Sequence, residues 1–293
     1  MTFFAGFLVV IVSVMGGFIL AGGTPLVLYQ PAEFMIIGGS ALGILVISTP
    51  TKVVKLLIAQ LRSVVGRGVS SEEYLQLLSM LYQLFRIVQQ SGVMALEPHF
   101  EEPKGSTVLS RFPGFLARHH ALSFLSDSVK VMISGGMSTH DLEALMDEDL
   151  HVHQEEALKP SSTVAKIGDA LPGLGIVAAV LGVVNTMAHI DGPPAEIGEK
   201  VGAALIGTFL GILLSYGFAQ PISMKLEHLV AEESSYLHCI KHGLLAVCKG
   251  MPPAIAIEFA RRALPDAVRP SFEETERACR GKTDAPAPAA MAA

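Results

Sequence analysis

The chain has 293 residues, of which 51% are hydrophobic and 16% are charged, and its mean hydropathy is +0.49. Soluble proteins carry about a quarter charged residues, so this composition excludes an ordinary soluble chain and indicates a membrane protein with several spans. The net charge of −6 argues against nucleic-acid binding, which would require a basic patch. Cys239, Cys248 and Cys279 lack CxxC spacing, so we expect free thiols and no metal site.

Residues 1–51 are predicted to contain the first two membrane-spanning helices. Thr2–Leu20 has no basic residues before its apolar run, and the run is longer than that of a secretory signal, so we interpret it as a span. Ala21–Glu33 is rich in Gly and Pro and predicts a short turn. The apolar segment Phe34–Thr49 then returns across the membrane.

Residues 52–166 are predicted to form a helical domain outside the bilayer. Ser70 and Glu73 fit a capping box, in which a serine and a glutamate three residues later cap a helix start. A second helix is predicted over 115–134, and a third from Ser138 to a stop at Pro160. Alternation of apolar and polar residues at period two is absent, so the predicted fold class is all-α.

Residues 167–224 are predicted to contain the third and fourth spans. Leu171–Ala188 and Val201–Ala219 carry no Asp, Glu, Lys, Arg or His, and each is about long enough to cross a hydrocarbon core of roughly 30 Å. A proton relay normally needs a titratable group inside the membrane. If the protein conducts protons, we therefore expect the carboxylate to come from another polypeptide.

Small residues recur along these two spans at intervals of four, which places them on one helix face. The positions are Ala203, Gly207, Gly211 and Ser215 in the fourth span, with Gly175, Ala178, Ala179 and Gly182 in the third. Such faces let membrane helices approach closely. They fit ordinary packing within one chain as well as they fit a subunit interface or a pore wall.

Residues 225–282 are predicted to continue as helices and end in a disordered tail. The helix that leaves the fourth span ends near Gly250, and the segment IAIEFARRAL forms one more short helix. Residues 283–293, rich in Pro and Ala, have too little bulky apolar surface to order themselves.

Lys and Arg residues predict the orientation of the chain. Of the 21 in the sequence, only Lys200 falls outside the two segments 52–166 and 225–282. The positive-inside rule then places both segments and both termini in the cytoplasm.

Alternative chemistry is weakly supported by the sequence. His151 and His153 are two residues apart and do not share a helix face, which favours solvated surface over a metal site. The acidic run 143–156 fits a solvated face or a dock for a basic partner. Because no nucleophile, phosphate loop or paired carboxylates stand out, we expect neither an enzyme nor a cofactor.

The segment Gly168–Pro221 resembles flagellar stator subunits of the MotA/TolQ/ExbB proton-channel family, with DALPGLGIVAAVLGVV and IGTFLGILLSYGFAQP as the matching motifs. The motifs LYQPAEFMIIGGSALG, ISGGMSTHDLEALMDED and PPAIAIEFARRAL extend the resemblance along most of the chain. Four spans with a large insertion are typical of the MotA branch, whereas TolQ and ExbB have three spans.

The resemblance implies a ring of five such subunits around two copies of MotB, which brings the proton-binding aspartate and grips peptidoglycan. Pro172 and Pro221, at the ends of the third and fourth spans, match the family's functional prolines, where a proline either ends a helix or forms a hinge. Thr208 matches the pore threonine. Ala179 stands where sodium-driven relatives carry a second threonine, so we expect H⁺ rather than Na⁺ to be translocated.

The resemblance also implies a rotor contact. Glu97 matches the cytoplasmic glutamate that engages the rotor protein FliG, whereas the family's rotor-facing arginine falls on Gln89. Arg86, one turn earlier, is the candidate substitute. The main hypothesis is a stator ring subunit. The alternatives are an ExbB- or TolQ-like energiser of outer-membrane transport or envelope integrity, and a scaffold without ion flux.

Overall fold

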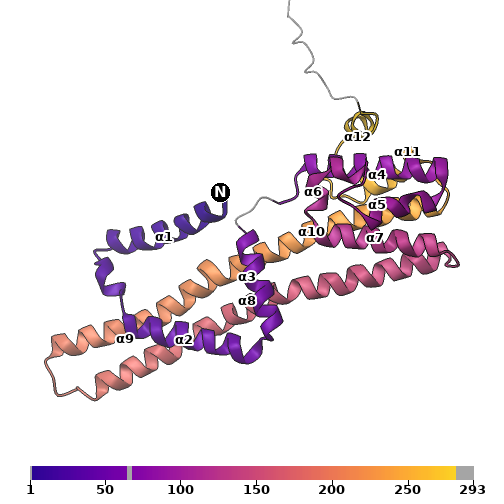
Figure 1. Ribbon diagram of the computed structural model, residues 1–293. Coiled ribbons are helices and arrows are strands. Elements are labelled where there is room, and N and C mark those ends of the chain that lie inside the picture. The colour runs from indigo at the N-terminus through magenta and orange to yellow at the C-terminus, as the bar shows by residue number, and fades with distance from the viewer. Residues whose placement is uncertain (1, 65–67, 282–293) are drawn as a thin grey trace, which may run out of the picture. The chain divides into compact units, whose positions relative to one another are not determined.

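The computed structural model describes residues 2–64 and 68–281, and within these ranges it consists of helices and connecting segments, with no strand (Figure 1). This confirms the all-α fold class. The chain divides into two compact units, unit 1 with residues 1–67 and 157–229 and unit 2 with residues 68–156 and 230–293. The predicted membrane boundaries near residues 51, 166 and 224 stay predictions, and the predicted tail 283–293 lies outside the described residues.

Unit 1 contains the apolar helices. In the part of the chain that the structure describes, four helical stretches are long and apolar enough to span a membrane, as the sequence predicts. The elements are α1 (Thr2–Leu20), η1 (Pro25–Leu28), α2 (Pro31–Ser48), α3 (Thr51–Ser63), the second part of α8 (Thr139–Met187), α9 (Pro194–Leu214), η4 (Ser215–Ala219) and the start of α10 (Gln220–Cys248).

Helix α8 begins as predicted but does not stop at Pro160. Ser138 caps its start, because the Asp141 N–H donates to Ser138 Oγ at 3.1 Å. An interior proline lacks an N–H and crowds the carbonyl four residues earlier, which costs about 3 kcal/mol. Gln60 Nε2 donates to the Ala157 carbonyl, three residues before Pro160, at 3.0 Å, and the helix continues through the proline.

The fourth span continues into α10 through one wide turn. The segment Ser215–Ala219 is a π-helix, and the Gln220 N–H donates to the Ser215 carbonyl five residues earlier. Pro221 follows directly and cannot donate to the carbonyl four residues before it. Such wide turns inside α-helices occur where the regular bonding ladder is interrupted, so this one is explained by Pro221.

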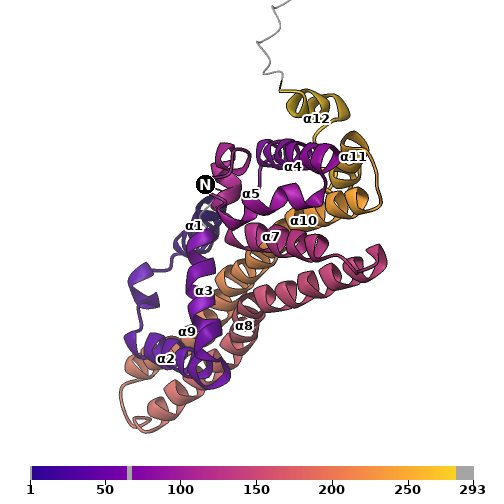
Figure 2. The same ribbon diagram turned by 45° about the vertical axis from the view of Figure 1, so that its right-hand side comes forward.

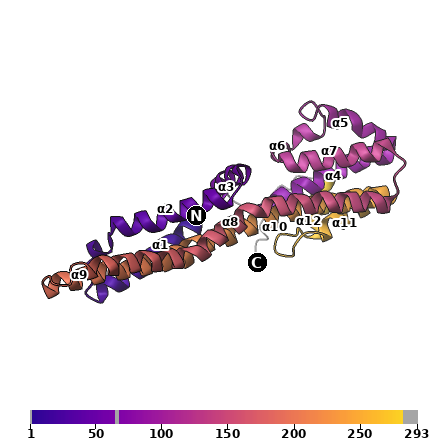
Figure 3. The same cartoon turned by 90° about the horizontal axis from the view of Figure 1, so that it is seen from below.

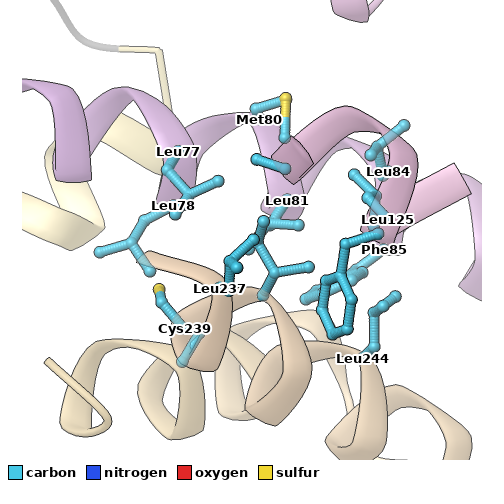
Figure 4. Packing of buried hydrophobic residues seen from close by; sticks show 14 of the residues in the cluster. Leu77, Leu78, Met80, Leu81, Leu84, Phe85, Leu125, Leu237, Cys239 and Leu244 are labelled. Carbon is cyan, nitrogen blue, oxygen red and sulfur yellow. The ribbon is translucent and has the colours of Figure 1, made fainter. Parts of the chain in front are cut away.

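Unit 2 is a helical bundle around one apolar core. Figure 4 shows Leu77, Leu81 and Phe85 of α4 packed toward Leu237 and Leu244 of α10, and all five side chains are at most 2% exposed. The unit contains α4 (Ser71–Ser91), η2 (Val93–Leu96), α5 (Glu97–Glu101), η3 (Leu109–Arg111), α6 (Pro113–Leu116), α7 (His119–Ser134), α11 (Pro253–Arg262) and α12 (Phe272–Cys279), with the first part of α8 and most of α10. Helices α11 and α12 pack against α4 (Figure 2).

Three details of unit 2 differ from the sequence prediction. Ser70 caps α4 by accepting from the Glu73 N–H, but the Glu73 carboxylate binds Arg118 Nη2 at 2.5 Å. Helix α12 was not predicted, although Ser271 and Glu274 form a reciprocal capping box at its start. The helix predicted from residue 115 begins at His119, because α6 forms a separate turn before it.

Candidate functional site

Helices α8 and α9 touch backbone to backbone in the middle of unit 1 (Figure 3). A Cβ added at Gly211 would lie 2.6 Å from the Leu171 carbonyl oxygen and 2.9 Å from Cα of Gly175. A Cβ added at Gly175 would lie 2.7 Å from the Gly207 carbonyl oxygen. No side chain fits in these gaps, so the small residues pack within one chain.

Thr208 and Ala179 both border this contact. The Cβ position of Gly175 is 3.3 Å from Cα of Thr208, and that of Gly207 is 3.2 Å from the backbone nitrogen of Ala179. Both residues are half-buried. The two positions that the sequence analysis assigns to the ion path therefore lie along the same helix pair.

The hydroxyl of Thr208 forms no hydrogen bond within the described part of the chain. By contrast, Thr186 Oγ1 on α8 donates to the Gly182 carbonyl at 2.8 Å, which is the usual way for a threonine to be satisfied in a helix. Thr208 thus keeps a donor and two acceptor positions for another group.

The two functional-proline candidates lie beside a bridge between helices. Gln220 Nε2, next to Pro221 on α10, donates to Asp169 Oδ1 on α8 at 2.7 Å, three residues before Pro172. Gly168 keeps this crossing close, since a Cβ there would lie 3.2 Å from Cβ of Ala219. The sequence pattern did not reveal this bridge, because its partners are 51 residues apart.

Glu33 occupies a position that the sequence analysis assigned to a turn. It is the third residue of α2 and only 7% exposed, and its Oε2 atom is buried without a hydrogen-bond partner. That oxygen lies too close to Gly207 for a Cβ to fit there without a shift. A carboxyl group of this chain therefore lies against the α8–α9 contact, and the expectation that the titrating carboxylate of the ion path comes from another polypeptide stays a prediction.

The rotor-contact candidates lie in unit 2 on neighbouring elements. Arg86 and Gln89 are near the end of α4, and Glu97 is the first residue of α5, which follows directly after η2. All three side chains are exposed. Neither Arg86 nor Glu97 forms an ion pair with any residue that the structure describes, so both charges are available to a partner.

Other charged groups of unit 2 are engaged inside the bundle. The guanidinium carbon of Arg118 lies 4.8 Å from the centre of the Tyr236 ring. Burial raises the pKa of the Tyr74 hydroxyl to about 12. His153 is partly buried rather than fully solvated, and the nearby carboxylate of Glu233, whose Oε1 is 3.6 Å from Nε2 of His153, raises the pKa of His153. No group of three or more His, Cys, Asp or Glu placed to hold a metal occurs in residues 2–64 and 68–281.

These features define a class of protein, a multi-span helical membrane protein with a glycine-packed helix pair and a separate helical unit. Known proteins match the chain over most of its length. The model of the N-terminal part of motility protein A matches residues 4–92, and that of the MotA/TolQ/ExbB proton channel family matches residues 117–238.

Motility protein A of Salmonella typhimurium is 42% identical over 272 residues, which cover 92% of each chain. Motility protein A of Escherichia coli is 41% identical with the same coverage, and chemotaxis protein LafT of Vibrio parahaemolyticus is 35% identical over 94% of this chain and 96% of its own. The chain therefore belongs to the motility protein A family of MotA/TolQ/ExbB proton channel proteins.

Solved structures share the fold. The structure of C. jejuni MotAB matches with a TM-score of 0.75 at 22% identity, covering 92% of this chain and 97% of that one. The flagellar MotAB stator complex from Bacillus subtilis matches with a TM-score of 0.70 at 23% identity, covering 91% and 96%.

Replacing Gly211 with Leu should disrupt the helix pair. The new side chain collides with the Leu171 carbonyl and with Gly175, and overpacking of this kind costs about 1–3 kcal/mol or more. The expected result is a large loss of intact protein in size-exclusion chromatography of detergent-solubilised membranes.

The matched control is Gly202→Leu on the same helix, because nothing lies within 4 Å of a Cβ added there. This variant should elute like the unsubstituted chain. An intact, functional Gly211→Leu protein would show that the contact between α8 and α9 tolerates separation.

Proposed function

We propose that this chain is the ring subunit of a flagellar stator, which couples ion flow across the inner membrane to torque on the rotor. The observation that carries this proposal is the 42% identity to motility protein A over 92% of both chains. The closely packed α8–α9 pair with an unengaged Thr208 hydroxyl supports it, since an ion path needs polar groups that are not already satisfied.

The proposed partners follow from what the chain lacks. Leu171–Ala188 and Val201–Leu214 carry no titratable group, so MotB would supply the main proton-binding aspartate and the peptidoglycan anchor. The similar solved structures are MotAB complexes. We extend the proposal to five chains around two MotB, with FliG as the rotor partner and both termini in the cytoplasm.

The ExbB- or TolQ-like alternative shares the proton channel family model over residues 117–238. The first 92 residues favour the stator, because they match the motility protein A model and contain two candidate spans. In either case the mechanism involves ion passage and conformational change rather than covalent chemistry on a substrate.

Deleting the gene tests the stator function directly. We expect cells that assemble complete flagella but do not swim, because a stator is required for torque and not for building the filament. Motility assays should be scored together with electron microscopy of filaments. Restoration by the chain expressed from a plasmid is the control, and normal swimming of the deletion strain would contradict the proposal.

The translocated ion is proposed to be H⁺. Sodium needs several oxygen ligands in place of its water shell, and at the α8–α9 contact Thr208 offers one hydroxyl while Ala179 offers only a methyl group. Rotation should therefore continue in sodium-free potassium medium at fixed pH and membrane potential. A motor that stops there, and recovers in proportion to added sodium, would show sodium coupling.

Charge reversal at the rotor contact should lower torque. Glu97→Lys reverses an exposed charge that has no ion-pair partner among the described residues. A surface ion pair with the rotor would contribute about 0–1 kcal/mol, so the loss of torque should be clearest when Glu97→Lys is combined with Arg86→Ala. The measurement is torque of tethered cells at equal membrane abundance. Glu101→Lys, on the same short helix, is the control, and unchanged torque in the double variant would remove both residues from the contact.

A further inference from the structure

Glu33 is the feature of unit 1 that the assigned ion path does not use. It is the only titratable residue within Pro31–Ser48, its side chain is 7% exposed, and its Oε2 atom has no hydrogen-bond partner. Buried polar atoms are nearly always paired, so an unpaired carboxyl oxygen requires an explanation.

The pocket around Glu33 is formed by small residues of the two facing helices. Its Oε2 atom stands against Gly207 of α9, and its Oε1 atom is 3.7 Å from the Cβ position of Gly182 on α8. A methyl group at residue 207 would clash with the carboxyl oxygen. The glycine contact thus leaves room for both a close helix approach and a carboxyl group.

No opposite charge compensates this carboxyl group. The facing segments, Leu171–Ala188 of α8, Val201–Leu214 of α9 and Pro25–Leu28 of η1, contain no Asp, Glu, Lys, Arg, His, Cys or Tyr. The charged residues of α9 lie near its start and are Glu196, Glu199 and Lys200. Among them, Lys200 Nζ is 3.2 Å from Glu196 Oε1. Tyr29, beside η1, is 68% exposed and has its ring near Phe34.

Two opposing effects act on the protonation of this group. An unpaired buried carboxylate is strongly disfavoured, so the packed state requires a bound proton. Glu33 also lies in the first turn of α2, where unpaired backbone N–H groups and the helix dipole favour negative charge. Both protonation states are therefore accessible once water reaches the pocket.

We propose that Glu33 is a second proton-exchanging site of the ion path, contributed by the ring subunit itself beside Thr208. The carboxylate takes one proton from water on the outer side, and the acid later releases that proton to water in the path, so Glu33 returns to its starting state. This inference rests on the proposed stator function. Glu33 thereby raises the local supply of protons to the path, while the partner's carboxylate carries the main transfer.

The test compares Glu33→Gln, which keeps size and polarity but cannot exchange a proton, with Glu33→Asp, which keeps the acid. Each is expressed with its stator partner in cells that lack the native gene, and motor speed is measured at low load, where ion transit sets the rate. Glu199→Gln is the matched control, because it removes an exposed carboxylate from the outer end of α9.

We expect Glu33→Gln to reach normal membrane abundance but to turn about threefold more slowly or worse, as for loss of an intramembrane titratable group. Glu33→Asp should keep most of the speed, and Glu199→Gln all of it. In infrared spectra of the purified complex, the carbonyl band of a protonated carboxyl group should be lost in Glu33→Gln and shifted in Glu33→Asp.

Wild-type speed in Glu33→Gln, or an unchanged carboxyl band, would overturn the inference and leave the stator function standing. If Glu33→Gln does not accumulate, Glu33→Asp decides: rotation with a shifted band supports proton exchange, and failure of both variants shows a packing role. Failure of the unsubstituted chain to restore rotation would instead contradict the stator function.

Discussion

The contact between α8 and α9 is the constraint on which unit 1 depends. Inside a bilayer, burying apolar side chains between helices gains little, because lipid tails are equally apolar, so close packing must supply the association. Here the Leu171 carbonyl and the backbone of Gly175 meet Gly211 without intervening side chains. The same close approach places Thr208 opposite the third span and leaves the carboxyl group of Glu33 enclosed.

Prolines shape these helices without ending them. Pro160 and Pro172 lie inside α8, and Pro221 follows the π turn at the start of α10. Close to Pro160, Ser223 Oγ of α10 donates to the Ser161 carbonyl at 2.9 Å, and Ser223 is 2% exposed. A proline interrupts the helical bonding ladder, so these are the points at which the helices can bend.

The sequence predicted the features that depend on local pattern. Four spans follow from apolar length, and the cap at Ser138 follows from residue type and spacing. Tertiary partners could not be predicted from local pattern: Gln60 donates to the Ala157 carbonyl, near Pro160, from 97 residues away in the chain, and the helix continues where local rules predicted a stop. The start of α12 carried a readable S-x-x-E signal that was overlooked. Glu33 was placed in a turn because its neighbours include Gly and Pro, and nothing local shows what it packs against.

The enclosure of Glu33 links proton binding to helix packing. The neutral acid fits between α2 and the glycines of α8 and α9, whereas an ionised carboxylate buried without a partner is disfavoured. Under the proposal that Glu33 exchanges protons, a movement that opens this contact to water would lower the proton affinity of the group, and by reciprocity release of the proton would favour the opened contact. A carboxyl group held in this way would then couple a change in packing to release of a proton. Replacement of Gly207 would affect both properties at once, because that single position makes room for the neighbouring helix and for the carboxyl oxygen.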